Sequence, residues 1–380
     1  MTTSDLDWRL GGSDGLVAGP TNSIADVRGV RVGHASREGD GWLTGNTVLL
    51  APDGARAGVD VRGGGPATRE TPALDPTALV ETIHAVSLSG GSAYGLESAA
   101  GVMLGLEDRG LGVPVGPGPR DVVPVVPAAS IFDLGRGGDV HARPDPGLAR
   151  EALEAAFAAE PGAAVQQGSV GAGTGAVTGL MRGGVGSASV VLPGGVTVAA
   201  LVVLNSLGSP LDPRTAVPHG ASALLRRPDG SPEIELPSPT PDQVREVRQR
   251  ISDEIERRST LKPLNTTLAV VATDADLTRA ELTRLAAASH TGMARAIRPV
   301  ATLSDGDVVF SLSPGGAGLP EAATDARPDA VNHVLSAGAD ALTRAIVHAT
   351  CAATSTVTPA GPLVAYRDLF PRRPTPPPPR

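Results

Sequence analysis

The sequence predicts an α/β protein in which helices cover the faces of sheets. Strand-like and helix-like segments alternate along its 380 residues, as in folds that pack helices on sheets. The run 196–204 is apolar except for Thr197, which is typical of a strand covered on both faces. Aromatic residues make up only 2% of the chain and apolar residues 41%. The core must therefore consist mainly of Ala, Val and Leu.

The first half of the chain contains strand-like runs and two helices. The runs "VRVGHA" and "TVLLAP" combine β-branched and apolar residues and are bounded by turn residues. A short strand is expected at 85–88, followed by a Gly-rich turn and a helix. Helical spacing predicts that the buried face of this helix consists of Ala93, Leu96, Ala100, Met103 and Leu104. An Ala-rich helix is expected at 146–160.

The second half begins with a hairpin and continues with helices and strands. The sequence "PGG" at 193–195 joins two β-runs, as hairpin turns do. Further on, Thr240 and Gln243 form a capping box around Pro241, which predicts the start of a helix. The linker "TLKPL" then leads to a buried strand. Helices at 276–288 and 329–353 flank the turn "SDGD" and the strand "VVFSLS".

The chain is expected to form one compact unit. Residues 1–21 are rich in Gly and Ser and are predicted to be loose, and the Pro-rich tail 369–380 is predicted to be extended or disordered. Between them, 22–368 is interpreted as a single domain, within which 208–265 is a connecting segment. We find no internal repeat.

Composition excludes several classes of partner. The net charge of −8 and the pI near 5.4 argue against nucleic acid, which binds to clustered Lys and Arg. The N-terminus has no basic region followed by an apolar run, and no apolar stretch is long enough to span a membrane. The single cysteine, Cys351, allows no internal disulfide. These observations predict a cytoplasmic protein that does not bind membranes.

Two kinds of ligand site are also unfavourable. The glycine loop at 168–179 lacks the helix and the downstream acidic residue of a dinucleotide fingerprint, so close backbone packing is the preferred interpretation. The seven histidines are scattered, and none forms a pair at metal-ligand spacing. The sequence predicts neither a metal nor a cofactor.

The tripeptide Asn265-Thr266-Thr267 has two interpretations. Asn favours turns and Thr favours strands, so the tripeptide can be an ordinary turn that leads into a strand. Alternatively, it is a cleavage point. A Thr made N-terminal by cleavage carries its own base, because the freed α-amine has an ordinary pKa of about 8.

Eight motifs in a fixed order resemble one family of enzymes. They are "DVRGVRVGHA", "AGVDVRGGGPATRE", "LSGGSAYGLESAAGVM", "VPVVPAASIFDLG", "GSVGAGTGA", "RGGVGSAS", "TVAALVVLN" and "NTTLAVVATDA". Together they are similar to the P1 family of peptidases (S58). This is the DmpA-like group of L-aminopeptidases/D-esterases, β-aminopeptidases and nylon-oligomer hydrolases. The resemblance extends over about residues 22–368.

The resemblance implies a fold and a self-processing step. The fold is a four-layer α/β/β/α sandwich of the N-terminal-nucleophile type. Members cut themselves into a larger and a smaller piece, here 22–265 and 266–368. The family's cut corresponds to the bond between Asn265 and Thr266, which makes Thr266 the nucleophile. A shift of one residue would make Thr267 the nucleophile instead.

The resemblance also implies other site residues. Asn205 corresponds to an Asn that helps to stabilise the oxyanion, as a preorganised amide donor can. Asp305 and Asp307 correspond to an acidic pair that orients the nucleophile and its amine, although Asp-Gly is also ordinary turn chemistry. Arg182 replaces a family Lys. It cannot act as a base but can still donate hydrogen bonds. Arg182 and Thr267 are both expected to support the oxyanion or the substrate.

The implied activity is hydrolysis of amide bonds through a Thr acyl-enzyme, without metal or cofactor. Substrates would be small peptides, amides or esters. A Glu and a Tyr that aminopeptidase members carry near "VPAASIFDLG" are absent, which leaves both aminopeptidase and amide-oligomer hydrolase open. The family implies a homo-oligomer of processed heterodimers. Two alternatives remain: an acyltransferase similar to ornithine acetyltransferase, and an uncleaved, non-catalytic scaffold.

Overall fold

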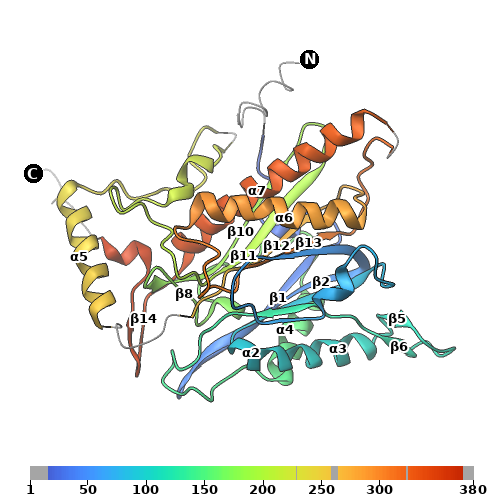
Figure 1. Ribbon diagram of the computed structural model, residues 1–380, viewed down its shortest axis with the longest axis horizontal. Coiled ribbons are helices and arrows are strands. Elements are labelled where there is room, and N and C mark those ends of the chain that lie inside the picture. The colour runs from blue at the N-terminus through green and yellow to red at the C-terminus, as the bar shows by residue number, and fades with distance from the viewer. Residues whose placement is uncertain (1–15, 228, 258–263, 322–323, 371–380) are drawn as a thin grey trace, which may run out of the picture.

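A computed structural model of the chain describes residues 16–227, 229–257, 264–321 and 324–370. Nine connected strands form two sheets that share one long strand and lie face to face between two layers of helices (Figure 1). Helices α6 (Arg279–Ala296) and α7 (Ala326–Ala352) cover one sheet. Helices α3 (Ala99–Glu107) and α4 (Pro146–Ala158) cover the other. The predicted four-layer α/β/β/α sandwich is confirmed.

The long strand β2 (Trp42–Val61) belongs to both sheets. The other strands of the two sheets are β1 (Arg31–Gly39), β3 (Thr68–Arg69), β4 (Ile83–Ser89), β7 (Ala128–Ser130), β10 (Gly184–Val191), β11 (Thr197–Leu204), β12 (Leu268–Thr273) and β13 (Val308–Ser313). Its second half pairs with β13 in the sheet under α6 and α7, in the order β10-β11-β12-β13-β2. Its first half pairs with β1 and β4 in the other sheet. The pairing with β4 is interrupted between Leu50 and Ala55.

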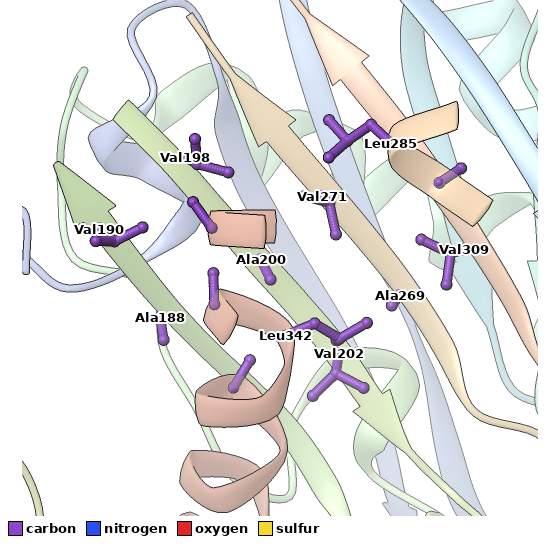
Figure 2. Packing of buried hydrophobic residues seen from close by; sticks show 14 of the residues in the cluster. Ala188, Val190, Val198, Ala200, Val202, Ala269, Val271, Leu285, Val309 and Leu342 are labelled. Carbon is purple, nitrogen blue, oxygen red and sulfur yellow. The ribbon is translucent and has the colours of Figure 1, made fainter. Parts of the chain in front are cut away.

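Alternating side chains of the central strands explain their continuous apolar sequences. In β11, Val198, Ala200 and Val202 face α6 and α7, where they pack with Leu285 and Leu342 (Figure 2). Their neighbours on the opposite face pack against the second sheet. That middle layer of the core includes Ala199, Leu201, Val203, Leu49, Val86, Leu88 and Phe310. A strand buried on both faces has no room for polar alternation.

Smaller elements lie around the sandwich. Short hairpins form from β5 (Val113–Pro114) and β6 (Val122–Val123), from β8 (Val177–Thr178) and β9 (Met181–Arg182), and from β14 (Thr356–Thr358) and β15 (Gly361–Leu363). Turns of 3₁₀-helix occur at Ile24–Asp26, Thr71–Leu74, Leu96–Ser98, Gly171–Gly173, His219–Ala223 and Tyr366–Leu369. Helix α5 (Pro241–Arg257) lies at one side of the molecule (Figure 1).

Several predicted element boundaries are confirmed. The hairpin at "PGG" pairs β10 with β11 in antiparallel register. Helix α5 begins with the expected capping box, in which Thr240 N–H donates to Gln243 Oε1 and Gln243 N–H donates to Thr240 Oγ1. The helix expected at 276–288 is present, but its boundaries differ, since it begins at Arg279 and continues to Ala296.

The predicted buried face after the Gly-rich turn is correct only in part: Leu96 and Met103 pack against the core, but Leu104 does not. The segment is a short helix, α2 (Ser92–Gly95), then a 3₁₀ turn, then α3. The tighter turn changes the rotation per residue and shifts the face that points inward. Ala99, Val102 and Leu106 are buried, whereas Leu104 is 54% exposed.

Parts of the predicted terminal segments lie outside the described residues, namely 1–15 and 371–380, as do residues 260–263 of the predicted linker. Within the described part, Val191 N–H donates to Val17 O and Gly19 N–H donates to Ser189 Oγ. These residues of the expected loose segment are therefore held against β10. Leu369, the first residue of the expected tail, is buried. Among the described helices, none has the length and apolar character needed to cross a membrane.

Candidate active site

Strand register brings the predicted site residues together at one end of three neighbouring strands. Strand β11 is antiparallel to β12, with Val203 opposite Leu268. Continuing this register places Asn205, just after β11, opposite Thr266, just before β12. Strand β13 is parallel to β12, and Asn265 forms a bridge with Asp305. Thr266 therefore lies between the end of β11 and the segment that leads into β13.

Thr266 is buried and makes close contact with the peptide group before it. Its Oγ1 lies 2.6 Å from the carbonyl oxygen of Asn265, and only 4% of the residue is exposed. Gly306 N–H donates to the same carbonyl oxygen at 3.0 Å. Thr266 N–H donates to Asn205 O at 2.8 Å. Both sides of the predicted scissile bond are thus held by hydrogen bonds.

Gly306 leaves the space that the Thr266 hydroxyl occupies. A Cβ atom built on Gly306 would lie 2.7 Å from Thr266 Oγ1 and 2.9 Å from Gly65 O, both closer than side-chain carbons approach. The glycine of "SDGD" is therefore required by the close approach of two backbone segments to the hydroxyl. A turn interpretation of this motif does not account for that approach.

Asn265 is fixed through its side chain as well as its backbone. Its Nδ2 donates to Val177 O at 3.1 Å and to Asn205 O at 3.0 Å, and its N–H donates to Ser304 O at 3.1 Å. These bonds join the β8–β9 hairpin, the end of β11 and the turn before β13. They hold the carbonyl of Asn265 beside the hydroxyl of Thr266.

The acidic pair, Asp305 and Asp307, is buried between these strand ends. Asp307 accepts hydrogen bonds from Thr267 N–H at 2.7 Å and from Ala301 N–H at 2.9 Å. Asp305 accepts from Leu207 N–H at 3.1 Å and from Thr302. Burial, together with the nearby charge of Asp305, raises the pKa of Asp307 to about 6. The pair therefore holds the residues that follow Thr266 and Asn205.

The carboxamide of Asn205 has three hydrogen-bond partners. Its Oδ1 accepts from Val177 N–H at 3.0 Å and from Nη1 of Arg136. Its Nδ2 donates to Phe132 O at 3.3 Å. Arg136 was not predicted from the sequence. It lies in "GRGG", directly after the last residue of the family motif "VPVVPAASIFDLG". The only indication in the sequence is an isolated Arg within a glycine-rich loop.

A family model and close relatives match nearly the whole chain. The model of peptidase family S58 matches residues 22–364. An uncharacterized aminopeptidase of Mycobacterium leprae is 43% identical over 371 residues, which covers 94% of this chain and 96% of the relative. The chain belongs to peptidase family S58. It is a hydrolase of peptide or amide bonds.

Other comparisons agree with this family. The 6-aminohexanoate-oligomer endohydrolase of a Kocuria species is 31% identical over 304 residues, covering 78% of this chain and 76% of the relative. A Burkholderia β-aminopeptidase structure has a TM-score of 0.66 at 23% identity, with 93% of each chain covered. An L-aminopeptidase D-Ala-esterase/amidase from Ochrobactrum anthropi, described as a variant of the Ntn hydrolase fold, has a TM-score of 0.65 at 21% identity and the same coverage. At these identities the two structures establish the fold alone.

Arg182 and Thr267, the two supporting residues, differ in position. Thr267 is fully buried beside Thr266, and its carbonyl accepts from Val308 N–H. Arg182 is also buried, and its Nε donates to Ser169 Oγ at 3.1 Å. Burial lowers the pKa of Arg182. Within the described residues no hydrogen bond joins Arg182 to Thr266. The role of Arg182 in supporting the oxyanion therefore stays a prediction from the sequence.

The glycine loop packs closely against strands near the site. A Cβ on Gly173 would lie 2.6 Å from Val185 N, and one on Gly175 would lie 2.2 Å from Leu43 O. These distances exclude a side chain at either position unless the backbone moves. They support the close-packing interpretation of 168–179 over a phosphate-binding one.

Proposed function

We propose that the chain cuts itself between Asn265 and Thr266 and that Thr266 then serves as the nucleophile of a peptide or amide hydrolase. The observation that carries the proposal is the distance of 2.6 Å between Thr266 Oγ1 and the carbonyl oxygen of Asn265. The hydroxyl donates to this oxygen, and because a C=O bond is about 1.2 Å long, the carbonyl carbon that it must attack lies no more than about 3.8 Å from Oγ1. Cleavage would give pieces 22–265 and 266–368 of one folded unit.

Self-cleavage begins with attack of Thr266 Oγ1 on the carbonyl carbon of Asn265. Gly306 N–H, which already donates to the carbonyl oxygen, would stabilise the oxyanion that forms there. The C–N bond then breaks, and the proton lost by the hydroxyl is transferred to the Thr266 nitrogen. The product is an ester between Asn265 and Thr266. Water hydrolyses this ester to leave a carboxylate on Asn265 and a free amine on Thr266.

The freed amine of Thr266 would act as the base in later turnovers. Its ordinary pKa of about 8 allows it to accept the hydroxyl proton at neutral pH and above. Oγ1 attacks the substrate carbonyl, Asn205 stabilises the oxyanion, and the leaving amine takes the proton. Water then hydrolyses the acyl-enzyme ester. Asn205 O, which accepts from Thr266 N–H in the intact chain, would orient the new amine, and the acidic pair would fix the strand ends.

The substrate class that we propose is a small amide, either an N-terminal residue of a peptide or an amide oligomer. The relatives named aminopeptidase and 6-aminohexanoate-oligomer endohydrolase support both forms. We further infer that the processed protein is a cytoplasmic homo-oligomer. The family resemblance supports the oligomer, and the net charge of −8 supports a partner other than nucleic acid.

The proposal is tested with p-nitrophenyl acetate and a panel of aminoacyl p-nitroanilides and 6-aminohexanoate oligomers. We expect the wild-type protein to be acetylated on Thr266, as mapped by mass spectrometry after acid quenching, and to hydrolyse at least one amide of the panel. Thr266→Ala should lose both reactions. The matched control, Thr267→Val, keeps the shape of the neighbouring side chain and should keep the adduct on Thr266.

Three results would contradict the proposal. An adduct on Thr267 would move the nucleophile by one residue. Transfer of the acyl group to an added amine in preference to water would identify an acyltransferase. A wild-type protein that reacts no faster than Thr266→Ala would support a non-catalytic scaffold.

A further inference from the structure

The carboxamide of Asn205 must face in one direction to stabilise an oxyanion. Only its NH₂ group can donate a hydrogen bond, whereas its oxygen would repel negative charge. Asn205 is fully buried at the end of β11. A reversed amide would therefore present the wrong atom to a substrate carbonyl. Something in the protein has to select the productive orientation.

Two donors meet at the side-chain oxygen of Asn205. Val177 N–H donates to Oδ1 at 3.0 Å, and Nη1 of Arg136 donates to the same atom. A backbone N–H and a guanidinium can only donate. If the amide reversed, its NH₂ group would face both donors without an acceptor. The two contacts thus assign the oxygen and leave Nδ2 on the opposite side.

The Nδ2 atom retains donor capacity. It carries two hydrogens, and among the described residues its only acceptor is Phe132 O, at 3.3 Å. The second N–H hydrogen therefore has no protein acceptor in the described structure. A charge-assisted bond to Oδ1 also polarises the amide, which makes its N–H groups better donors.

Arg136 is held in place by its own surroundings. Its Nη1 also donates to Gly175 O at 2.7 Å, and its backbone N–H donates to Asp133 O at 3.2 Å. Gly137, the next residue, has no room for a side chain, since a Cβ there would lie 2.4 Å from Gly41 O. The loop is therefore packed too closely to move far. The guanidinium approaches Asn205 from a fixed direction.

We propose that Arg136 is a positioning residue that fixes the Asn205 carboxamide with its NH₂ group available to the oxyanion of the substrate. This inference rests on the proposed role of Asn205. Arg136 acts through Asn205 and adds a positive charge on the side of the amide away from the oxyanion. Its removal should lower kcat and leave KM within about threefold, because substrate binding does not depend on the orientation of the amide.

The test is a double-mutant cycle that follows acylation by p-nitrophenyl acetate. We expect Asn205→Ala to lower the acylation rate by about 100-fold. Arg136→Met keeps the length of the apolar stem without the donors, and should lower the rate by about tenfold or more in the wild-type background. In the Asn205→Ala background the same substitution should have no further effect. Arg136→Lys keeps a charged donor and should recover part of the lost rate.

The outcomes separate the inference from the proposal on which it rests. Equal losses from Arg136→Met in both backgrounds would show a general structural role and overturn the inference alone. A wild-type rate for Asn205→Ala would overturn the role of Asn205 and with it that of Arg136. The adduct on Thr266 would still stand as a separate result. If Arg136→Met does not fold, the cycle is run with Arg136→Lys and the same criterion of additivity applies.

Discussion

Two buried clusters of charged side chains join the segments before and after the Asn265–Thr266 bond, and they differ in whether a cation is present. In the Glu233 cluster, the Glu233 carboxylate lies 2.6 Å from Arg344 Nη2 and 2.7 Å from His348 Nε2. Leu225 N–H donates to it as well. The acidic pair, by contrast, has no cation within ion-pair distance among the described residues, and its acceptors are filled by backbone N–H groups and Thr302.

The two clusters respond to burial in opposite ways. In the Glu233 cluster, burial opposes ionisation, but hydrogen bonds from His348 and Arg344 hold the pKa of Glu233 well below its ordinary value. In the acidic pair, burial and like charge raise the pKa of Asp307 to about 6. Removing one partner of a buried ion pair destabilises the fold, whereas a buried carboxylate with a raised pKa and no neighbouring cation is typical of functional sites. Of the two clusters, only the acidic pair contacts residues next to Thr266.

The largest effect is expected from neutralising the compensated cluster. Glu233→Gln leaves Arg344 buried without a counter-charge, and should lower the free energy of unfolding by about 3–5 kcal/mol. Thermal and denaturant unfolding measure this loss. The exposed Glu235→Gln is the matched control and should change stability by less than about 0.5 kcal/mol. Equal stabilities of the two variants would contradict the structural role of the cluster.

A smaller effect on stability but a larger one on rate is expected from the acidic pair. Asp307→Asn provides one acceptor where the carboxylate serves both Thr267 N–H and Ala301 N–H. The strand next to Thr266 should shift, and self-cleavage should slow by about 100-fold. A time course on denaturing gels measures this rate, with the exposed Asp40→Asn as control. Because the amide also removes a buried charge, the thermal midpoint should fall less than in Glu233→Gln. The opposite order would reverse the assignment of the two clusters.

The pH dependence of the self-cleavage rate is expected to follow the ionisation of Asp307. The raised pKa of Asp307 means that the ionised, two-acceptor form is lost as pH falls through about 6. The rate of self-cleavage in the intact chain should therefore fall about tenfold per pH unit below about 6. In Asp307→Asn this fall should be absent. An unchanged profile in that variant would exclude Asp307 as the titrating group.

The contributions of Asp307 and Glu233 to the stability of the fold depend on pH in opposite directions. Protonated Asp307 favours the fold, and this contribution is complete below the unfolded value of 3.8 and lost as pH rises through about 6. Ionised Glu233 favours the fold above its unfolded value of 4.5, and this contribution is lost as pH falls. Activity and the stability from Asp307 thus change in opposite directions with pH.

The sequence was sufficient for features whose signal is local or periodic. The apolar run that became β11 predicted burial on two faces, and Val198 and Leu201 face different layers of the core. The capping box at Thr240 fixed the start of α5. The order of motifs predicted the four-layer fold. It also predicted that Thr266, Asn205 and the acidic pair belong to one site, and the strand register brings them together.

Features that depend on contacts distant in the sequence were not predicted. Arg136 meets Asn205 across 69 residues, and nothing in its own segment specifies that partner. The buried face of α3 was predicted only in part: Met103 packs against the core, but Leu104 is exposed because the preceding 3₁₀ turn alters the helical phase. Helical spacing assumes a constant rotation per residue, and Ser92, whose positive φ is uncommon for a non-glycine residue, precedes that interruption.

The central claim is that Thr266 cleaves the bond before it, and denaturing mass spectrometry of the purified full-length chain tests this most directly. The account predicts two pieces whose masses meet between Asn265 and Thr266, with Thr266 identified by sequencing as the new N-terminus. Thr266→Ala should remain one chain, and Thr267→Val should still be cut. A wild-type protein that stays a single 38.2 kDa chain after long incubation would contradict the account. Cleavage that persists in Thr266→Ala would also contradict it.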